Sequence, residues 1–361
     1  MKIVIDARFT RTDHHDGISR YGSSLIAATA KIADVTMLIS DPRQLALLPD
    51  VPHVLVNSPL SPMELFVARE VNKLGADVVV CPMQTMGTLG RKYGLVLTLH
   101  DLIYYEHPAP PGFLPAPVRL LWRLYHKAFW PQRVLLNRAD VVATISHTTE
   151  ALMAKYRLTS RPVRIVGNAP QPGQQPRDPG AGAEKSLLYM GSFMPYKNVE
   201  TMIRGMAGLP DFTLHLLSRI TPQRRAELEA LVPAGADVRF HNGVTDEEYS
   251  ALLAKATALV SLSRAEGYGL PLVEAMSLGT PVIASDIPIF REVGSDAASY
   301  VDPDSPAAFT AAVQQLRDGG FWQKRSRRSV ERAADFSWED SARQLLAVAD
   351  EIVAMRGRKR R

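Results

Sequence analysis

Two glutamates, Glu266 and Glu274, stand eight residues apart around a short glycine-rich loop. Pro271 follows this loop, and proline favours the first turn of a helix because its missing N–H is not needed there. The backbone N–H groups of residues 267–270, helped by the dipole of the following helix, would form an anion site suited to a diphosphate. Two carboxylates beside such a site need hydrogen-bond donors, and sugar or ribose hydroxyls are natural partners.

The elements that must position this loop are short apolar runs that alternate with longer helical patterns. Strands separated by helices indicate parallel sheets with helices on both faces. A segment rich in proline, glycine and glutamine at 169–185 interrupts the alternation and predicts a linker. The strands predicted before it are Lys2–Asp6, Val35–Ile39, Asp77–Val80, Leu95–Leu99, Asp140–Ile145 and Arg164–Val166, and those after it are Ser186–Met190, Thr213–Leu217, Val238–Phe240, Ala258–Leu262 and Pro281–Ala284.

This order predicts an α/β fold with two doubly wound domains, 1–168 and 186–340, joined by the linker 169–185. Residues 341–361 are predicted to form a helix that returns toward the N-terminal domain and ends in a basic tail. Ligands of open parallel sheets bind beyond the carboxyl ends of the strands. If the two sheets face each other, the residues expected there would line one cleft. These residues are Gly17, His100, Asp101, Ser146, Asn168, Gly191, Ser192, Ser218, Arg219, Asn242, Gly243 and the stretch Ser263–Leu270.

The segment EGYGLPLVEAMSLGTPVIASD, which contains both glutamates, closely resembles the donor-site signature of retaining GT-B glycosyltransferases of the family 4 type. The likeness continues through Phe290–Gly294 and Val301–Pro303 to Phe336–Trp338. Upstream, the segment Tyr189–Ser192 with Lys197 and Asn198 resembles the phosphate-binding segment of that family. The resemblance runs from about residue 17 to 340 and implies the GT-B fold, with two Rossmann-like doubly wound domains facing across a cleft.

The resemblance implies roles for the two glutamates and for a lysine. Glu266 would contact the donor sugar and help to stabilise charge at the reacting carbon, and Glu274 would hold the ribose hydroxyls. Lys197 would neutralise the diphosphate as it leaves, as a clamp on developing charge does. The donor-binding loop would comprise Gly267, Tyr268, Gly269 and Leu270, next to Ser192 of the phosphate-binding segment.

Further donor contacts are expected elsewhere. Gly17 would let the backbone approach the phosphates, and His100 would reach the donor sugar from the N-terminal domain. Part of the nucleobase pocket would be formed by Asn242, Gly243 and Val244. The family often has an arginine five or six residues before the lysine, where this chain has Gly191 and Ser192. Arg219 is the predicted substitute. Gly17 is equally compatible with a turn. For His100 the donor role is favoured over a structural hydrogen bond, and for Arg219 the donor role is balanced against the absence of one.

The implied activity is retaining transfer of a sugar from a nucleotide sugar to a glycan or lipid-linked acceptor in bacterial polysaccharide synthesis, with GDP-mannose as the first donor to test. The nucleotide sugar is then a co-substrate, and no cofactor or metal is expected. Metal sites at His14-His15 and at Asp302-Pro303-Asp304 lack a convergent ligand set. The alternatives are another GT-B enzyme (a nucleotide-sugar epimerase or a phosphorylase) and a non-catalytic nucleotide-sugar-binding protein.

Composition narrows the class of protein. The chain has 361 residues, of which 46% are hydrophobic and 22% charged, and this balance excludes a disordered chain. No G-x-G-x-x-G follows the first strand, which argues against a nicotinamide enzyme. The single cysteine, Cys81, follows an apolar run and is predicted to be buried and inert. With no run long enough to span a membrane, a cytoplasmic protein is expected, and peripheral association with the inner face of the membrane stays open.

The net charge of +5 is concentrated in residues 1–168, where Lys and Arg outnumber Asp and Glu by 19 to 13, and in the tail after Met355. Such an excess implies an anionic partner. Along 118–129 an apolar stripe runs beside Arg119, Arg123 and Lys127 and predicts an amphipathic helix. That helix either lies on anionic lipid or turns its stripe to the core, which the sequence slightly favours. No nucleic-acid-binding module accompanies the charge. The stripe consists of Val118, Leu121, Trp122, Tyr125 and Phe129.

Overall fold

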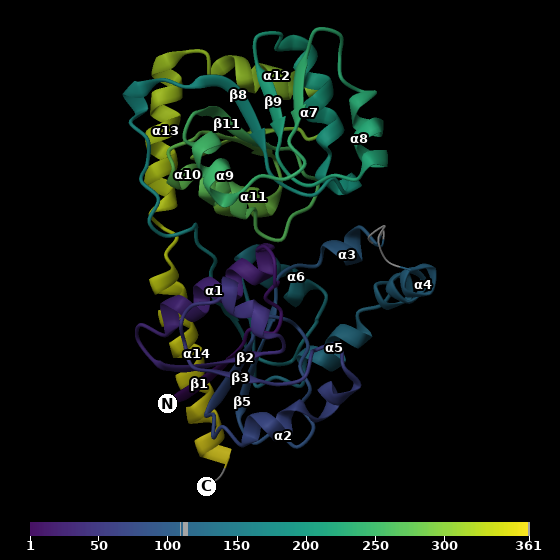
Figure 1. Ribbon diagram of the computed structural model, residues 1–361, viewed down its shortest axis with the longest axis vertical. Coiled ribbons are helices and arrows are strands. Elements are labelled where there is room, and N and C mark those ends of the chain that lie inside the picture. Colours follow the sequence, from purple (N-terminus) through teal and green to yellow (C-terminus); the bar gives the residue numbers. More distant parts are fainter. Residues whose placement is uncertain (109, 111–114, 360–361) are drawn as a thin grey trace. The chain divides into compact units, whose positions relative to one another are not determined.

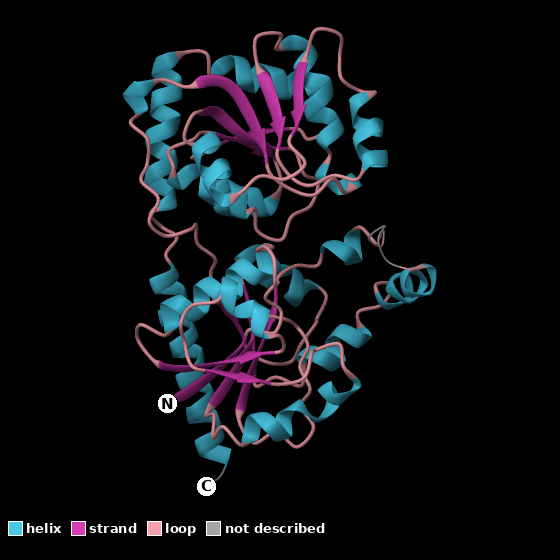
Figure 2. Cartoon of the chain, viewed as in Figure 1, coloured by secondary structure: helices cyan, strands magenta, loops and turns pink. Residues whose placement is uncertain are grey.

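The computed structural model describes residues 1–108, 110 and 115–359, which form two compact units (Figure 1). The first unit is Met1–Ala169 with Ser337–Arg361, and the second is Pro170–Phe336. In each unit helices cover both faces of one parallel sheet (Figure 2). The predicted pair of doubly wound α/β units is therefore confirmed.

The first unit has a seven-stranded sheet in the order β3-β2-β1-β4-β5-β6-β7. Every residue of β4, β5 and β6 is buried, because helices pack on both faces of a parallel sheet, and such strands are continuous apolar runs in the sequence. The strands are β1 (Lys2–Asp6), β2 (Asp34–Ile39), β3 (His53–Leu55), β4 (Val78–Cys81), β5 (Gly94–Leu99), β6 (Val141–Thr144) and β7 (Val163–Ile165). The helices are α1 (Gly17–Thr29), α2 (Val67–Asn72), α3 (Ile103–Glu106), α4 (Ala116–Tyr125), α5 (Trp130–Leu136), α6 (His147–Lys155) and α14 (Trp338–Lys359), with 3₁₀ helices η1 (Pro42–Leu47) and η2 (Pro62–Phe66).

The second unit has a six-stranded sheet in the order β10-β9-β8-β11-β12-β13. Its strands are β8 (Glu184–Tyr189), β9 (Thr213–Leu216), β10 (Asp237–Phe240), β11 (Ala256–Ser261), β12 (Val282–Ser285) and β13 (Ala298–Val301). Its helices are α7 (Val199–Gly205), α8 (Pro222–Glu229), α9 (Asp246–Leu253), α10 (Leu270–Ser277), α11 (Pro288–Gly294), α12 (Pro306–Gln315) and α13 (Gly319–Ala333), with 3₁₀ helices η3 (Pro179–Ala181), η4 (Pro195–Lys197) and η5 (Met206–Gly208).

Two edge strands, β3 and β13, were not predicted. Both are short, and their burial is partial, so neither forms an apolar run. The predicted linker 169–185 also needs correction, since β8 begins inside it at Glu184. Arg177 of this segment donates to the carbonyl of Ala256 at 2.9 Å and stacks on the ring of Trp322. The second half of the segment is therefore packed onto the second unit.

The C-terminal helix α14 belongs to the first unit and packs against α1 and β5. The rings of Tyr21 and Trp338 lie 6.0 Å apart between α1 and α14. In the basic tail, Arg356 donates to the carbonyl of Lys92 at 2.6 Å and lies 3.6 Å from the carboxylate of Asp140. Arg356 of the basic tail is thus held within the first unit, in agreement with a helix that returns to the N-terminal domain. Arg360 and Arg361 lie outside the described residues.

Candidate functional site

The loops that follow β9, β8 and β11 meet at one edge of the second sheet, because these strands are neighbours and all run parallel. Two hydrogen bonds join these loops. The N–H of Gly191 donates to Oγ of Ser218 at 3.0 Å, and the N–H of Arg264 donates to the carbonyl of Tyr196 at 2.7 Å. This edge is where ligands of doubly wound sheets bind.

Asn198 holds the loop after β8 in place. It is buried and has the left-handed conformation (φ 53°, ψ 42°), which asparagine tolerates better than most residues. Its side-chain amide donates to the carbonyls of Leu262 at 3.1 Å and Pro303 at 2.6 Å. One side chain therefore ties together the chain beyond β8, β11 and β13, and it places the preceding residue, Lys197, at the edge of the sheet. Its bracing role was not predicted from the sequence.

Lys197 and Glu266 form an ion pair at this edge. The distance from Nζ of Lys197 to Oε1 of Glu266 is 2.5 Å, and the side chains are only 14% and 13% exposed. Oγ of Ser263 donates to the same carboxylate oxygen at 2.8 Å. The structure thus brings together the lysine and the glutamate that the sequence singled out. Ser263 begins the predicted stretch 263–270, and its hydrogen bond to Glu266 was not predicted. The ammonium group of Lys197, which has three N–H donors, therefore already has one anionic partner, and a phosphate that binds it would compete with this carboxylate.

The loop after Glu266 leads into α10 as the sequence predicted. Gly269 is the N-cap residue with φ 96°, and Pro271 lies in the first turn. Glu274 lies within α10 and is 6% exposed. The ring of the buried Tyr268 packs edge-on against that of Phe336, with ring centroids 6.4 Å apart. The helix start and the two carboxylates therefore occupy the places on which the predicted anion site depends.

Replacing Gly269 by Ala is expected to distort this loop. The residue has φ 96°, and an added Cβ would lie 2.8 Å from Cε1 of Phe290. A positive φ costs a residue with a Cβ on the order of 1 kcal/mol, and the clash adds to this. We expect a lower melting temperature and weaker nucleotide binding, measured by thermal unfolding and calorimetry. Gly319→Ala is the matched control, since a Cβ there meets nothing within 4 Å; equal behaviour of the two variants would contradict the prediction.

The remaining predicted residues of the second unit follow β8, β9 and β10. Arg219 is exposed and forms no side-chain hydrogen bond or ion pair with a described residue. A Cβ added at Gly243 would lie 3.1 Å from Cγ of Arg219. Asn242 accepts at Oδ1 from the N–H of Ile220 at 3.1 Å. Ser192 is exposed, and Val244 is half-buried. The loops after β9 and β10 are thus joined, and the guanidinium of Arg219 is available to an anion.

In the first unit, His100 follows β5 and Gly17 begins α1. Nε2 of His100 lies 2.7 Å from the carbonyl of Pro82, and the ring packs edge-on against Tyr21 at 5.0 Å. Since a carbonyl only accepts, Nε2 donates and Nδ1 carries the lone pair. No Cβ contact restricts Gly17, which follows the N-cap Asp16. The roles of both residues toward a donor stay predictions.

Burial lowers the pKa of His100 below the usual value of a histidine, about 6.5. The unfolded chain therefore takes up a proton at His100 before the folded protein does, and the free energy of unfolding falls as the pH drops below 6.5. When the pH is lowered from 7.5 to below 6.5, we expect the free energy of unfolding to fall less for His100→Gln than for the wild type. Denaturant unfolding at several pH values measures this, with the exposed His53→Gln as control. Identical pH dependence of wild type and His100→Gln would contradict it.

At the two candidate metal sites considered from the sequence, side chains contact other side chains of this protein. Nδ1 of His14 lies 2.9 Å from the carboxylate of Asp13, Nδ1 of His15 lies 2.9 Å from Oγ of Ser19, and Asp304 pairs with Arg264. Among the residues that the structure describes, no group of three or more His, Cys, Asp and Glu side chains could hold a metal ion. Cys81 is buried, as predicted.

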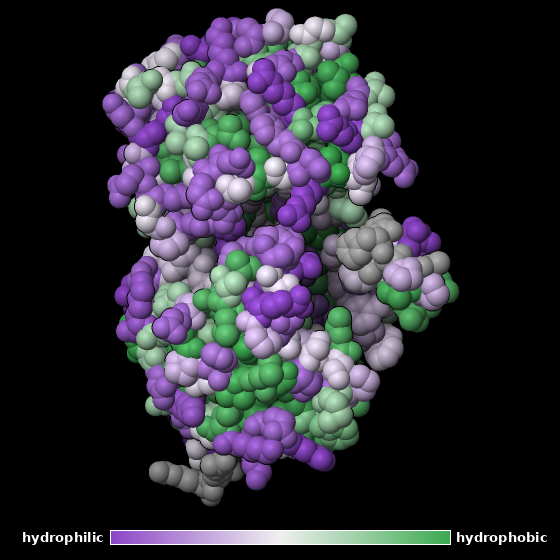
Figure 3. Space-filling view, viewed as in Figure 1, coloured by the Kyte–Doolittle hydropathy of each residue, from purple (hydrophilic) through white to green (hydrophobic). Residues whose placement is uncertain are grey.

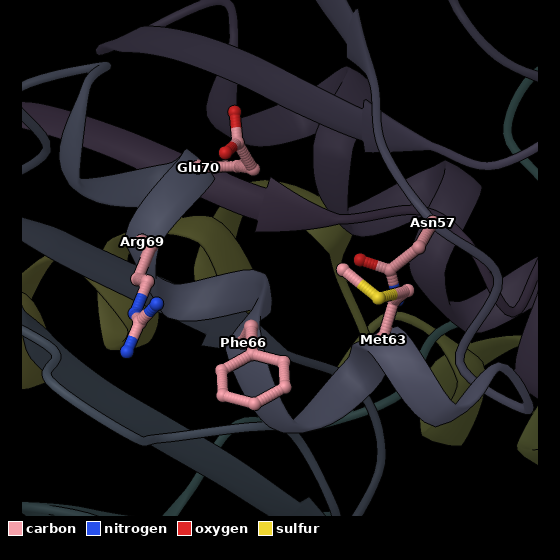
Figure 4. Close-up of a pocket in the computed structure, with 5 residues that line it drawn as sticks. All are labelled: Asn57, Met63, Phe66, Arg69 and Glu70. Atoms are coloured by element: carbon pink, nitrogen blue, oxygen red, sulfur yellow. The ribbon is translucent and has the colours of Figure 1, made fainter.

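A cavity of about 340 Å³ opens in the first unit, beside η2 and α2. Figure 4 shows its lining side chains, Asn57, Met63, Phe66, Arg69 and Glu70. The guanidinium of Arg69 lies 4.9 Å from the ring centroid of Phe66. None of the predicted site residues lines this cavity.

Comparison with known proteins gives the same picture of the second unit. Residues 174–335 match the sequence profile of the family described as Glycosyl transferases group 1. The O-antigen chain mannosyltransferase RfbU of Salmonella typhimurium is 26% identical over 325 residues, which are 83% of this chain and 87% of that protein. Sucrose-phosphate synthase of Thermosynechococcus elongatus has a TM-score of 0.76 and 21% identity over 98% of this chain and 99% of its own. HepE of Anabaena in complex with UDP-glucose has a TM-score of 0.72 and 16% identity over 97% and 100%.

The fold is that of the GT-B glycosyltransferases, as the resemblance implied. The second unit, which carries Lys197, Glu266 and Glu274, is a glycosyl transferases group 1 domain. The chain thus contains a domain of this group and has mannosyltransferase homologues.

Proposed function

We propose that this protein transfers mannose from GDP-mannose to a glycan or lipid-linked acceptor in bacterial polysaccharide synthesis, with retention of the anomeric configuration. The observation that carries the proposal is the ion pair of Lys197 and Glu266, placed before α10 of a group 1 domain. Mannose is favoured because a relative that aligns over 87% of its own length is an O-antigen chain mannosyltransferase. A nucleotide-sugar donor is also consistent with the UDP-glucose bound by HepE.

In the proposed reaction, the diphosphate of the donor binds Lys197 and the backbone at the start of α10. Its negative charge displaces the carboxylate of Glu266, which then faces the donor sugar and stabilises the positive charge that develops at the anomeric carbon. Lys197 stabilises the diphosphate as the bond to the sugar breaks. Glu274 holds the ribose hydroxyls, and the leaving diphosphate assists attack by the acceptor hydroxyl on the same face of the sugar.

The proposed reaction needs no metal ion, since Lys197 and helix α10 supply the positive potential that the leaving diphosphate requires. The proposed location is the cytoplasm, because it contains sugar nucleotides and its reducing conditions keep a thiol such as that of Cys81 reduced. No helix of the described residues is long and apolar enough to cross a membrane.

Arg219 is proposed to supply the second cation for the diphosphate. It is exposed, makes no ion pair with any described residue, and follows β9 at the ligand-binding edge of the sheet. Arg219→Ala is therefore expected to weaken donor binding several-fold, about 1 kcal/mol for one charge-assisted contact. Calorimetric titration of the donor measures it. Arg327→Ala, an exposed arginine of α13 in the same unit, is the control, and an unchanged donor affinity in Arg219→Ala would show that the assignment is wrong.

Product analysis tests the proposed function. Purified protein is incubated with GDP-mannose and a panel of glycan and lipid-linked acceptors, and products are followed by NMR, which reports both transfer and anomeric configuration. Acceptor-dependent release of GDP with a retained α-linkage supports the proposal. Conversion of the donor without an acceptor would identify an epimerase, and a requirement for inorganic phosphate would identify a phosphorylase. Binding of the donor without turnover, with any acceptor of the panel, would favour the non-catalytic alternative.

A further inference from the structure

A basic cavity lies beside helix α13 in the second unit. Its volume is about 460 Å³, which is within the range of cavities that hold small molecules. None of the residues predicted for the donor site lines it. Hydrophilic side chains predominate on the surface where Figure 1 labels α13 (Figure 3). The residues that line the cavity are Asp296, Lys324, Arg325, Arg327, Arg328 and Glu331.

The positive charge on α13 contrasts with the charge of its unit. Residues 170–336 contain 17 Lys and Arg and 20 Asp and Glu, so the unit is acidic as a whole. Five of the 17 bases nevertheless lie within the nine residues Lys324–Arg332 of α13. Lys324 lies three and four positions before Arg327 and Arg328, and like charges at this spacing on a helix repel one another. An anion bound at this surface would relieve the repulsion.

The two carboxylates of the cavity are both bound by Arg328. Nε of Arg328 donates to the two carboxylate oxygens of Asp296 at 2.8 and 2.9 Å, and Nη1 donates to the carboxylate of Glu331 at 2.9 Å. The contact with Arg328 lowers the pKa of Asp296 below its usual range. Among the described residues, Arg328 is the only base of the cavity that has a carboxylate partner.

The other three bases lack such a counterion. Lys324 and Arg327 are exposed and form no side-chain hydrogen bond or ion pair with a described residue. Arg325 is half-buried and donates to two neutral oxygens, the carbonyl of Asp296 at 2.9 Å and Oγ of Ser299 at 3.2 Å. Its Nε is buried without a hydrogen-bond partner in the described part of the chain. Burial lowers the pKa of Arg325, because the negative charge nearby does not offset the loss of hydration.

We propose that the cavity beside α13 binds a dianionic phosphate group, either inorganic phosphate or the phosphate of a small phosphomonoester, between Lys324, Arg325 and Arg327. A phosphomonoester carries nearly two negative charges at pH 7 and has three terminal acceptor oxygens, which suits three bases without counterions. Arginine donates pairs of N–H groups to phosphate oxygens, and such charge-assisted hydrogen bonds are stronger than neutral ones. A carboxylate has one charge and would leave two of the bases without a counterion. The acidic balance of the rest of the unit disfavours a long polyanion.

This phosphate site is separate from the proposed donor site. Asp296 precedes β13, and Ser299 lies near the start of this strand, so the cavity adjoins the amino end of β13. The donor site is proposed at the opposite, carboxyl ends of β8 and β11 in the same parallel sheet, where Lys197 and Glu266 form their ion pair. Substitutions on α13 are therefore expected to leave donor affinity unchanged, and the phosphate site does not depend on the proposed transfer activity.

The test is equilibrium dialysis of the full-length protein with radiolabelled inorganic phosphate and, separately, radiolabelled glucose 6-phosphate, at an ionic strength held constant with sodium chloride. The wild type and Lys197→Gln are both expected to bind at least one of these probes saturably. Tighter binding of glucose 6-phosphate would identify a phosphomonoester as the ligand, and equal or tighter binding of inorganic phosphate would identify the free ion. Absence of binding of both probes, or binding that is lost in Lys197→Gln, would overturn the proposal.

One double variant and a matched control locate the site. Lys324→Gln with Arg327→Gln is expected to weaken binding at least about tenfold, because two of the three bases without counterions are removed. The control is Arg204→Gln with Lys255→Gln, two exposed bases of the same unit that form no side-chain hydrogen bond or ion pair with a described residue. The control is expected to bind within about twofold of the wild type, since exposed charges at a distance are screened.

Circular dichroism and the melting temperature of each variant confirm that it is folded. Equal losses of binding in the two double variants would show that net charge alone attracts the phosphate. Unchanged binding in Lys324→Gln with Arg327→Gln would show that the cavity beside α13 is not the site. Either result overturns the proposal.

Discussion

Glu266→Gln is expected to slow sugar transfer by roughly 10²–10³-fold while affinity for the nucleoside diphosphate stays the same or rises. The rate falls because the amide cannot stabilise positive charge at the anomeric carbon. The affinity does not fall because the carboxylate of Glu266 lies 2.5 Å from Nζ of Lys197 and competes with the diphosphate for it. Single-turnover kinetics and calorimetric titration measure the two effects separately.

The matched control is Glu247→Gln, an exposed glutamate of α9 in the same unit. It is expected to leave both rate and affinity unchanged, although it changes the net charge by the same amount. The rate of each variant is measured well below its melting temperature, because Lys197 loses its ion-pair partner in Glu266→Gln. Equal losses of rate and of diphosphate affinity in Glu266→Gln would contradict the assigned role.

Lys197→Ala is expected to weaken binding of the nucleoside diphosphate at least about tenfold and also to destabilise the protein. The first effect follows from loss of a cation beside the phosphates. The second follows because the carboxylate of Glu266, only 13% exposed, is left without its cation; loss of one partner of a buried pair costs up to about 3 kcal/mol. Calorimetric titration measures the affinity, and denaturant unfolding measures the stability.

The double variant Lys197→Ala with Glu266→Ala separates these two effects. Removal of both charges leaves no unpaired ion, so the double variant is expected to be more stable than Lys197→Ala alone. Its diphosphate affinity is expected to stay low. Lys255→Ala, an exposed lysine just before β11, is the control for the single variant. If the stability losses of the single variants Lys197→Ala and Glu266→Ala simply add in the double variant, the ion pair does not couple these residues.

Most strands could be predicted from the sequence because each central strand of a parallel sheet is buried on both faces. β5 and β6, for example, are buried throughout and contain no polar residue other than Thr98 and Thr144. The same pattern placed Glu266 in the loop after a strand, the family resemblance singled out Lys197, and a glycine-rich loop ahead of Pro271 predicted the start of α10. The edge strands β3 and β13 could not be found in this way, since a short, half-exposed strand leaves no apolar run.

Other features depend on contacts between residues that are distant in the sequence. Asn198 bridges Leu262 and Pro303, and Lys197 reaches Glu266 because β8 and β11 are neighbours. The helix predicted over 118–129 also needed the structure, since α4 ends at Tyr125 and its apolar stripe is divided. Trp122 packs against Tyr104, whereas Leu121 is 66% exposed. An asparagine directly before a predicted helix is the signal that could have pointed to the bracing role of Asn198.

Calorimetric titration of GDP, UDP and dTDP into the wild-type protein and Lys197→Ala tests the central claim most directly. The account predicts that one diphosphate, GDP first among them, binds the wild type most tightly and that Lys197→Ala binds it at least about tenfold more weakly, whereas Lys255→Ala binds it as the wild type does. Absence of binding by all three diphosphates, or equal affinity in the wild type and Lys197→Ala, would contradict a nucleotide site built on the ion pair of Lys197 and Glu266.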